Sequence, residues 1–413
     1  MKVIRAFIKD SFLAVTAGSV KYHVWMGFLT LLMLTGGYAY SIQLREGLVV
    51  TGMSDAVSWG LYISNFTFFV GVAAAAVMLV LPTYVLHDVD TKGAVLIGEG
   101  LAVAALVMCL AFVVADMGGP AVLWHMIPII GVFNWPQSML AWDVIVLNVY
   151  LFINATIPLY ILFNHYQGKE PDRRVYIPGV FLSVFWAFLL HLVTAFLYSG
   201  LSSRTFWNTA LLGPRFLASA FAAGPALMIL ILSAIHAFSD YNVGKAIFGK
   251  LALIVTVASQ VNIIMLVSEL FTEFYTPTHH NQSATYLFFG LDGFNALRPW
   301  IWTAIALSVV ATLILTINPL RRNPTLLRLA CVMLFVGIWV EKGFGLIIPG
   351  FIPGQWGKIT EYTPTWIEVL VTVGIWGLGA FIFTLLVKVA LPIELGYRRY
   401  QSKATTMLPV AGD

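Results

Sequence analysis

Charge is scarce in this chain. Only 10% of its 413 residues are Asp, Glu, Lys or Arg, whereas about a quarter of a soluble domain is charged. Hydrophobic residues make up 60% of the chain, and the mean hydropathy is +0.88. This composition excludes an ordinary soluble domain and predicts an all-α integral membrane protein whose main partner is the lipid bilayer.

Cysteine is almost absent, which limits the redox centres that the chain can hold. Cys109 and Cys331 lie far apart in apolar stretches, and neither belongs to a C-x-x-C pair. The chain therefore lacks the ligands for an iron–sulfur cluster of its own and for covalent haem. His191 is the only histidine well inside a predicted span, so a non-covalent haem b is not favoured. No P-loop, nucleotide-binding glycine motif or metal-ligand spacing occurs, so the sequence predicts no metal site and gives ATPase and hydrolase activities no support.

Long apolar runs are what the sequence has in abundance. Each is long enough to cross about 30 Å of hydrocarbon, and all are too long and unbroken for barrel strands. They predict about ten transmembrane helices, at 22–40, 57–81, 93–116, 139–163, 175–199, 213–236, 245–271, 298–317, 325–348 and 364–389.

Basic residues give these spans an orientation. Most of the 23 Lys and Arg residues lie in the two termini and in alternate connections, which places both termini on the cytoplasmic side of the cell membrane. The remainder lie elsewhere: Arg45, Arg204, Arg215, Arg298, Lys342 and Lys358. The pI near 8.9 follows from this topology and does not indicate a nucleic-acid partner.

Two long connections, 117–138 and 272–297, follow the third and the seventh span. Their Gly, Pro, aromatic and His content suits a docking surface or a cap over a site. Their regular placement predicts two four-helix bundles flanked by two peripheral helices. The expected units are an N-terminal segment with the first helix, the first bundle, the second bundle, and the last helix with a cytoplasmic tail, at 1–56, 57–199, 200–348 and 349–413.

Polar side chains inside the apolar runs gather in the outer half of the predicted bilayer. A carboxylate at mid-bilayer costs roughly 2.5–3.5 kcal/mol on insertion scales, so a set at one depth requires a ligand, a proton path or mutual pairing. The residues concerned are Asn65, Asp116, Asp143, His191, Arg215, Glu269 and Glu341. Pairing of Arg215 or Lys342 with Glu269 or Glu341 is the simplest account of the second-bundle members, and a role in proton transfer stays open for His191, Glu269 and Glu341.

The fourth span carries the clearest pattern. Asp143, Tyr150 and Asn154 lie within about 20° of one helical face, and His165 continues that face past the inner end. This stripe predicts a route for protons. Hydrogen bonding between helices is an equally good explanation for Tyr150 and Asn154, but an ionisable group such as Asp143 is a functional candidate by default.

Asp116, the loop residue His125 and Asp143 reach one membrane face and are the candidate catalytic residues. The imidazole of His125 suits proton exchange because its unperturbed pKa lies near neutrality, although a lone loop histidine is more often structural. Asn65 offers an amide to a ligand carbonyl. These polar groups lie in an apolar, aromatic wall, and the chain has no redox centre of its own. Such a site suits an amphiphilic ligand such as a quinone.

Four segments carry a resemblance to a known family. Trp59–Asn65, Asp116–Pro120, Trp124–Met126 and Ser138–Asp143 resemble the NrfD/polysulfide reductase membrane-subunit family, and the likeness extends over nearly the whole chain. Further segments are most similar to its ten-span DsrP branch, which belongs to the Dsr membrane complex of dissimilatory sulfur metabolism: His191–Phe196, Phe206–Ala210, Pro214–Phe216 and Glu269–Tyr275.

The resemblance implies menaquinone or a related quinone bound near the outer face of the first bundle. It also implies electron exchange with an external ferredoxin-like iron–sulfur subunit, beside other membrane and cytochrome subunits of a Dsr-type complex. Asn65, Asp116, His125 and Asp143 match family positions, and the matching segments add further quinone-pocket candidates: Tyr62, Trp124, Ser138 and Trp142. Gly119 and Val122 stand where the family usually has arginines.

The leading hypothesis is thus a quinone-reactive subunit of a respiratory redox complex, in which proton movement is an open question. The alternative is a secondary transporter or proton-conducting subunit without quinone chemistry. The scarcity of Gly and Pro at matching mid-membrane positions favours the first reading. A membrane anchor with a vestigial pocket is a third reading.

Overall fold

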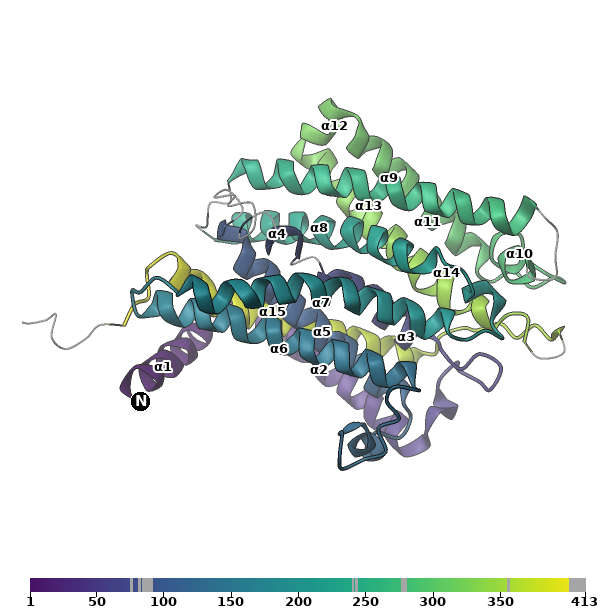
Figure 1. Cartoon of the computed structure of the whole chain (residues 1–413), viewed down its shortest axis with the longest axis horizontal. Coiled ribbons are helices and arrows are strands. Elements are labelled where there is room, and N and C mark those ends of the chain that lie inside the picture. The colour runs from purple at the N-terminus through teal and green to yellow at the C-terminus, as the bar shows by residue number, and fades with distance from the viewer. Residues whose placement is uncertain are drawn as a thin grey trace, which may run out of the picture.

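The computed structural model describes residues 1–74, 77–80, 83, 92–239, 241, 244–275, 281–354 and 357–400. Over these ranges the chain forms helices joined by turns and loops, and its β-structure is limited to an isolated bridge between Leu291 and Phe294. The all-α prediction is therefore confirmed. Figure 1 shows the long helices running roughly alongside one another.

Within the described ranges, eight helices are long and apolar enough to cross a membrane. Two further elements occupy the positions expected for the first two spans: the 27-residue α2 and the shorter α3, followed by α4. The chain is a multi-pass membrane protein. The helices are α1 (Lys2–Thr16), α2 (Val20–Glu46), α3 (Leu61–Ala73), α4 (Val77–Val80), α5 (Lys92–Asp116), α6 (Met139–Tyr166), α7 (Arg173–Ser199), α8 (Leu212–Phe238), α9 (Lys245–Tyr275), α10 (Gln282–Phe288), α11 (Arg298–Thr316), α12 (Asn318–Arg322), α13 (Pro324–Lys342), α14 (Phe344–Ile347) and α15 (Trp366–Glu394), with short 3₁₀ turns η1 (Leu48–Val50), η5 (Pro120–Met126), η6 (Thr205–Trp207) and η8 (Pro349–Phe351).

The long helices pack in two sets of four. In the first set, α5 packs against α3 and α6, and α7 packs against α6 and α3. In the second set, α8 packs against α9 and α13, and α11 packs against the same two helices. The sets meet where α8 contacts α3 and α7 and where α13 contacts α3. The unit boundaries derived from the sequence stay a prediction, but the helices group as the two predicted bundles do.

Two peripheral helices, α2 and α15, pack on each other, and α15 also packs on α5 of the first set. Glycines bring the two backbones together: a Cβ on Gly36 would lie only 2.6 Å from the Cα of Gly374. Small residues at a helix crossing allow this close approach. Inside a bilayer no hydrophobic force drives helices together, so the van der Waals contacts of such a crossing stabilise the pair. The first and last spans therefore form one layer on the side of the first bundle (Figure 1).

Both ends of the described chain lie at the same end of the bundles (Figure 1). The segment before the first span, expected only as a cytoplasmic tail, contains α1. Its Asp10 accepts a hydrogen bond from Tyr166 at 2.6 Å through its carboxylate and another from Arg398 through its carbonyl oxygen. The amide of Tyr400 donates to Tyr166. This shared location agrees with an even number of spans, whereas its assignment to the cytoplasmic side stays a prediction.

The opposite end, which carries the last residue of α5 and the first of α6, is called the outer end below. Of the two long connections that lie here, 117–138 contains η5 and 272–297 contains α10. The latter is a correction, because the sequence analysis expected this segment to be a loop. Tyr286 explains the helix: it is fully buried, and α10 packs on α11 and η8.

Candidate functional site

At the outer end of the first bundle, Tyr62 belongs to a short hydrogen-bond chain. Its hydroxyl donates to Oε1 of Gln43 at 2.6 Å, and the amide of Gln43 donates to the carbonyl of Ala115 at 2.6 Å. The next residue, Asp116, has its Oδ1 buried without a hydrogen-bond partner among the described residues. Tyr62 lies within electrostatic range of Asp116 and of Glu368. Through Gln43, the peripheral helix α2 thus holds Tyr62, a candidate quinone contact, near Asp116, a candidate catalytic acid.

Glu368 links the segments before α3 and α15 by hydrogen bonds, a role that the sequence analysis missed. It is fully buried at the start of α15, where it forms a capping box with Thr365. Its carboxylate also accepts hydrogen bonds from the amide of Gly52 at 2.6 Å and from the hydroxyl of Tyr362 at 2.5 Å. Burial and the neighbouring Glu368 carboxylate raise the pKa of Tyr362 above its ordinary value. Tyr362 accepts from the amide of Leu61 at 2.8 Å, so this network anchors the start of α3.

Deeper in the first bundle, Asp143 is 1% exposed. Its Oδ1 accepts a hydrogen bond from the hydroxyl of Thr194 at 2.9 Å, which joins α6 to α7. One turn further along α7, Tyr198 shares a hydrogen bond with Thr67 of α3. Tyr198 lies within electrostatic range of both Asp143 and Asp116. The fold therefore brings the two predicted acids to a common neighbour inside the first bundle.

Asn65 is fully buried and contacts helices outside the first bundle. Its Oδ1 accepts hydrogen bonds from the indole N–H groups of Trp339 at 3.0 Å and Trp376 at 3.1 Å. Its Nδ2 donates to the carbonyl of Leu61 at 2.8 Å. Since an amide nitrogen carries two N–H groups, one donor of Asn65 is not committed by these contacts. The side chain thus fastens α13 and α15 to α3, a role that the sequence analysis did not foresee.

Trp124 and His125 lie in η5, on the connection between α5 and α6. Their rings stack with centroids 3.8 Å apart, and Trp124 is 47% exposed. In the part of the chain that the structure describes, no hydrogen bond or ion pair joins His125 to Asp116 or Asp143. The structure therefore places this pair on the outer surface and leaves it outside the buried acid group.

Ser138 and Trp142 shape the beginning of α6. Ser138 is its N-cap, and its side chain accepts from the amide of Ala141. The indole of Trp142 donates to the carbonyl of Pro136 at 2.8 Å. These contacts set where α6 starts and so fix the depth of Asp143, one turn into the helix.

The predicted stripe on α6 is buried along its length. Tyr150 is fully buried, and its hydroxyl is among the buried groups without a hydrogen-bond partner in the described chain. Asn154 donates to the carbonyl of Tyr150 at 2.8 Å. At the inner end, Nδ1 of His165 lies 2.8 Å from Oε2 of Glu394. The stripe therefore runs from the outer acid Asp143 to an inner His–Glu pair.

Glu99 of α5 was absent from the sequence-based candidates. It is 4% exposed, and its Oε2 is buried with no hydrogen-bond partner in the described ranges. It lies within electrostatic range of Tyr150. The signal was available, since Glu99 is a carboxylate in an apolar run, but it falls in the inner half of its span and outside the outer cluster.

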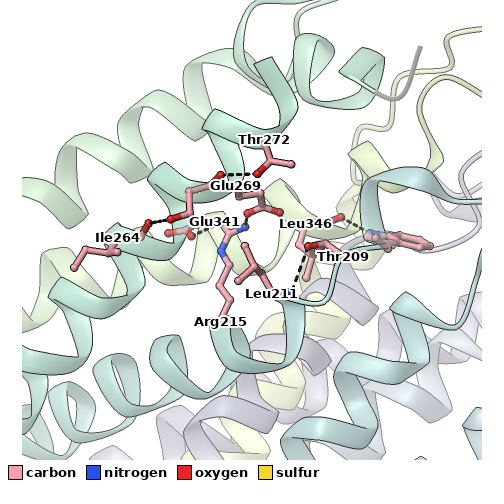
Figure 2. A network of polar contacts seen from close by, with 10 residues as sticks. Thr209, Leu211, Arg215, Ile264, Glu269, Thr272, Glu341 and Leu346 are labelled. Atoms are coloured by element: carbon pink, nitrogen blue, oxygen red, sulfur yellow. Dashed lines mark hydrogen bonds and ion pairs between the residues drawn. The ribbon is translucent and has the colours of Figure 1, made fainter. Parts of the chain in front are cut away.

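In the second bundle, Arg215 of α8 reaches between two carboxylates (Figure 2). Its guanidinium pairs with Glu269 of α9 and, at 2.6 Å, with Glu341 of α13. The predicted pairing is confirmed for Arg215. This arrangement holds three helices of the second bundle together by one cation.

A cavity of about 30 Å³ lies beside this triad. Its wall includes Arg215, Glu269, Glu341, Lys342 and Asn262 among apolar side chains. Asn262 is 2% exposed, and its Oδ1 has no hydrogen-bond partner within the described residues. A water molecule needs about 10–15 Å³ of such space, so the cavity has room for about two water molecules and is too small for a quinone ring.

Lys342 extends from this cavity toward the first bundle. Its Nζ lies 3.4 Å from the carbonyl oxygen of Phe216 and 4.1 Å from the centre of the Phe216 ring. A Cβ on Gly71 of α3 would lie 3.2 Å from this Nζ, so the glycine leaves space for the ammonium group. On α7, His191 is fully buried; its Nδ1 lies 2.8 Å from the Ala187 carbonyl, and its Nε2 has no hydrogen-bond partner among the described residues.

Comparison with known proteins agrees with this architecture. Three relatives align over most of their own length: the membrane subunit of a putative dimethyl sulfoxide reductase of Halobacterium salinarum (24% identity, 87% of this chain and 88% of the relative), the integral membrane subunit of an Hdr-like menaquinol oxidoreductase of Archaeoglobus fulgidus (24%, 91% and 95%) and a selenate reductase subunit of Mesobacillus selenatarsenatis (22%, 87% and 92%). The family model described as polysulphide reductase, NrfD, matches residues 49–353. The chain belongs to the NrfD polysulphide reductase family.

Proposed function

We propose that this chain is the quinone-reactive membrane subunit of a respiratory redox complex, with its site in the outer half of the first bundle. The names of its relatives support the class of reaction: one is a subunit of a menaquinol oxidoreductase, and two are subunits of reductases. The quinone that follows from this comparison is menaquinone. With two distant cysteines the chain has no ligand set for an iron–sulfur cluster, so the proposal passes the electrons to another subunit.

The observation that carries the proposal is the pair of acids around Tyr198. Asp116 has a buried oxygen with no partner in the described chain, and Asp143 accepts a hydrogen bond from the neutral hydroxyl of Thr194. A buried carboxylate without a cation is costly in a membrane, so its retention indicates a function. In the proposed site, a quinol hydroxyl enters from the outer half of the first bundle and gives its proton to one of these acids.

Menaquinol loses two electrons and two protons and becomes menaquinone. The electrons pass to an iron–sulfur centre of an external ferredoxin-like subunit, one proton passes to Asp116 and the other to Asp143. His125, at the surface, is the proposed exit to water for the proton of Asp116. The proposed quinone contacts are Tyr62, Asn65, Trp124, Ser138 and Trp142. The N–H of Asn65 that does not bond to Leu61 is the proposed donor to a quinone oxygen.

The remaining assignments rest on resemblance. The segments shared with the DsrP branch support a place in dissimilatory sulfur metabolism, with further membrane and cytochrome subunits of a Dsr-type complex as partners. The distribution of Lys and Arg supports a location in the cytoplasmic membrane with both termini inside. The exposed apolar and aromatic side chains of the connection 117–138 suit contact with such a partner.

The test compares quinol-dependent reduction of the iron–sulfur partner in the purified complex carrying Asp143→Asn or the wild-type residue. An asparagine keeps the hydrogen bond with Thr194 and cannot take a proton, so we expect turnover to fall by about a hundredfold or more with assembly intact. Asn148→Ala on the exposed face of α6 is the control, because the side chain of Asn148 bonds to the carbonyl of Val144 in its own helix and to no other described helix. Unchanged turnover in Asp143→Asn would overturn the proposed site.

A second candidate function is proton conduction or secondary transport without quinone chemistry. The cavity beside Arg215, Glu269 and Glu341 in the second bundle, which has room for water, favours it. It predicts ion flux in proteoliposomes that contain no quinone, whereas the quinone-reactive subunit predicts flux or turnover only when quinol is added.

A further inference from the structure

We propose that Lys342 and His191 form a lateral proton connection between the two bundles, from Asp143 to the cavity of the second bundle. The inference rests on the proposed function, because menaquinol oxidation supplies the proton to Asp143. It assigns a carrier role to Lys342, a residue that sequence reasoning treated as a structural charge.

The position of Lys342 is the first argument. It is 6% exposed, it lines the second-bundle cavity, and its Nζ lies against Gly71 of α3 in the first bundle. No carboxylate in the described part of the chain lies within ion-pair distance of it; Glu341 and Glu269 are both paired with Arg215 instead. The ammonium is held by Phe216, through its carbonyl and its ring. A lysine whose proton is not locked in an ion pair suits proton exchange.

His191 is the residue with which Lys342 exchanges a proton in this proposal. His191 directs Nδ1 to the Ala187 carbonyl, an arrangement in which Nδ1 carries the proton and Nε2 is a lone-pair acceptor. That Nε2 is buried and has no partner among the described residues, and His191 lies within electrostatic range of Lys342. A buried acceptor without a donor is rare and needs an explanation. Exchange of a proton with Lys342 through an intervening water provides one.

The connection to Asp143 is the third argument. Thr194, which bonds Asp143, is one turn from His191 on α7. Cys109 of α5 lies within electrostatic range of both Asp143 and Lys342, so these two groups share a neighbour inside the protein. On the other side, Asn262 and Glu341 line the cavity that Lys342 reaches. Residues of α5, α6, α7, α9 and α13 therefore take part in the proposed connection.

The transfer is a proton relay without redox change. The ammonium of Lys342 gives a proton to water in the second-bundle cavity. The neutral amine then takes a proton from the imidazolium of His191, which in turn has received the proton from Asp143. Each acceptor gains one N–H or O–H bond as its donor loses one.

The sharpest test is Lys342→Arg, because arginine keeps the positive charge and cannot release a proton. If Lys342 carries protons, menaquinol-dependent turnover of the purified complex falls by about tenfold or more, and proton release slows with it. Lys388→Arg is the matched control, since Lys388 is also stacked on an aromatic ring, 4.7 Å from the centre of Tyr22, far from this interface. Thermal unfolding of both variants checks that they fold.

A second variant keeps the inference testable if the larger arginine disturbs packing. His191→Gln retains a polar side chain that cannot carry a proton, and we expect a similar loss of turnover. Because two members of one relay fail together, the double variant should be no slower than the slower single variant.

Wild-type turnover in both Lys342→Arg and His191→Gln overturns the relay and leaves the proposed function intact. Losses that multiply in the double variant also overturn it, since they indicate independent structural effects. A wild-type complex that does not oxidise menaquinol overturns the proposed function itself.

Discussion

Both bundles contain buried acids, and among the described residues these acids differ in whether a cation pairs with them. In the second bundle, Arg215 neutralises Glu269 and Glu341. In the first bundle, Glu99, Asp116 and Asp143 form no ion pair with any described Lys or Arg, and two of them have an oxygen with no hydrogen-bond partner there. Paired carboxylates stabilise a membrane bundle, whereas unpaired ones cost energy. The difference therefore points to the first bundle as the place of chemistry and to the second as a charge-balanced neighbour.

Removing the cation of the second bundle should have the largest effect on stability. Arg215→Met leaves two buried carboxylates without a partner, which typically costs about 3–5 kcal/mol. Thermal unfolding in detergent measures the loss. Arg298→Met removes the same charge from an exposed position at the outer end of α11 and should change the unfolding temperature little. Equal unfolding temperatures for the two variants would break the comparison, because the triad would then contribute nothing.

Asn65 joins the bundles, and its loss should have the next largest effect. Asn65→Ala leaves the indole N–H groups of Trp339 and Trp376 without their acceptor, at a cost of about 2–3 kcal/mol. Chemical or thermal unfolding of the purified protein measures this loss of stability. The reference is Asn148→Ala, since Asn148 is exposed and its amide bonds to the carbonyl of Val144 in the same helix. If both variants unfold alike, Asn65 does not fasten α13 and α15 to α3.

The smallest change in stability is expected when Glu99 is neutralised. Whether that change is a loss or a gain distinguishes the unpaired acids of the first bundle from the paired acids of the second. Glu99→Gln removes an acid that pairs with no Lys or Arg of the described residues, so stability should change by less than about 0.5 kcal/mol or rise. Glu341→Gln removes half of a salt-bridge network and should lower stability by about 2 kcal/mol. Parallel unfolding curves measure both. A larger loss from Glu99→Gln than from Glu341→Gln would show that the first-bundle acid has a stabilising partner.

The spans were predictable because the apolar runs are long and uninterrupted, and most helix ends fall within a few residues of the expected ones. Larger differences occur at the ends of the first and ninth spans, where α2 continues to Glu46 and α13 stops at Lys342, and at the start of the second span, where α3 begins at Leu61 and not at 57. A backbone turn from Ser54 to Val57 and the hydrogen bond from Leu61 to Tyr362 hold the preceding residues outside the helix. The contact with Tyr362 joins segments some 300 residues apart, so no local pattern reveals it.

The pairing of Arg215 was predictable since few charges share its depth. The position of Lys342 was not, because it depends on the space beside Gly71 and on the ring of Phe216, which only the packing of α3 on α8 brings together. The same holds for Asn65, whose two indole partners come from α13 and α15. Sequence indicated which polar residues lie in the membrane, and tertiary packing decides what each contacts.

The most direct measurement maps where the quinone binds. A photoreactive menaquinone analogue is cross-linked to the purified complex, and the labelled peptides are identified by mass spectrometry, with excess menaquinone as competitor. The account predicts competed labels on the outer halves of α3, α5, α6 and α7, near Asp116 and Asp143. Competed labels confined to α8, α9, α11 and α13 would contradict it, since they would place the quinone in the charge-balanced bundle.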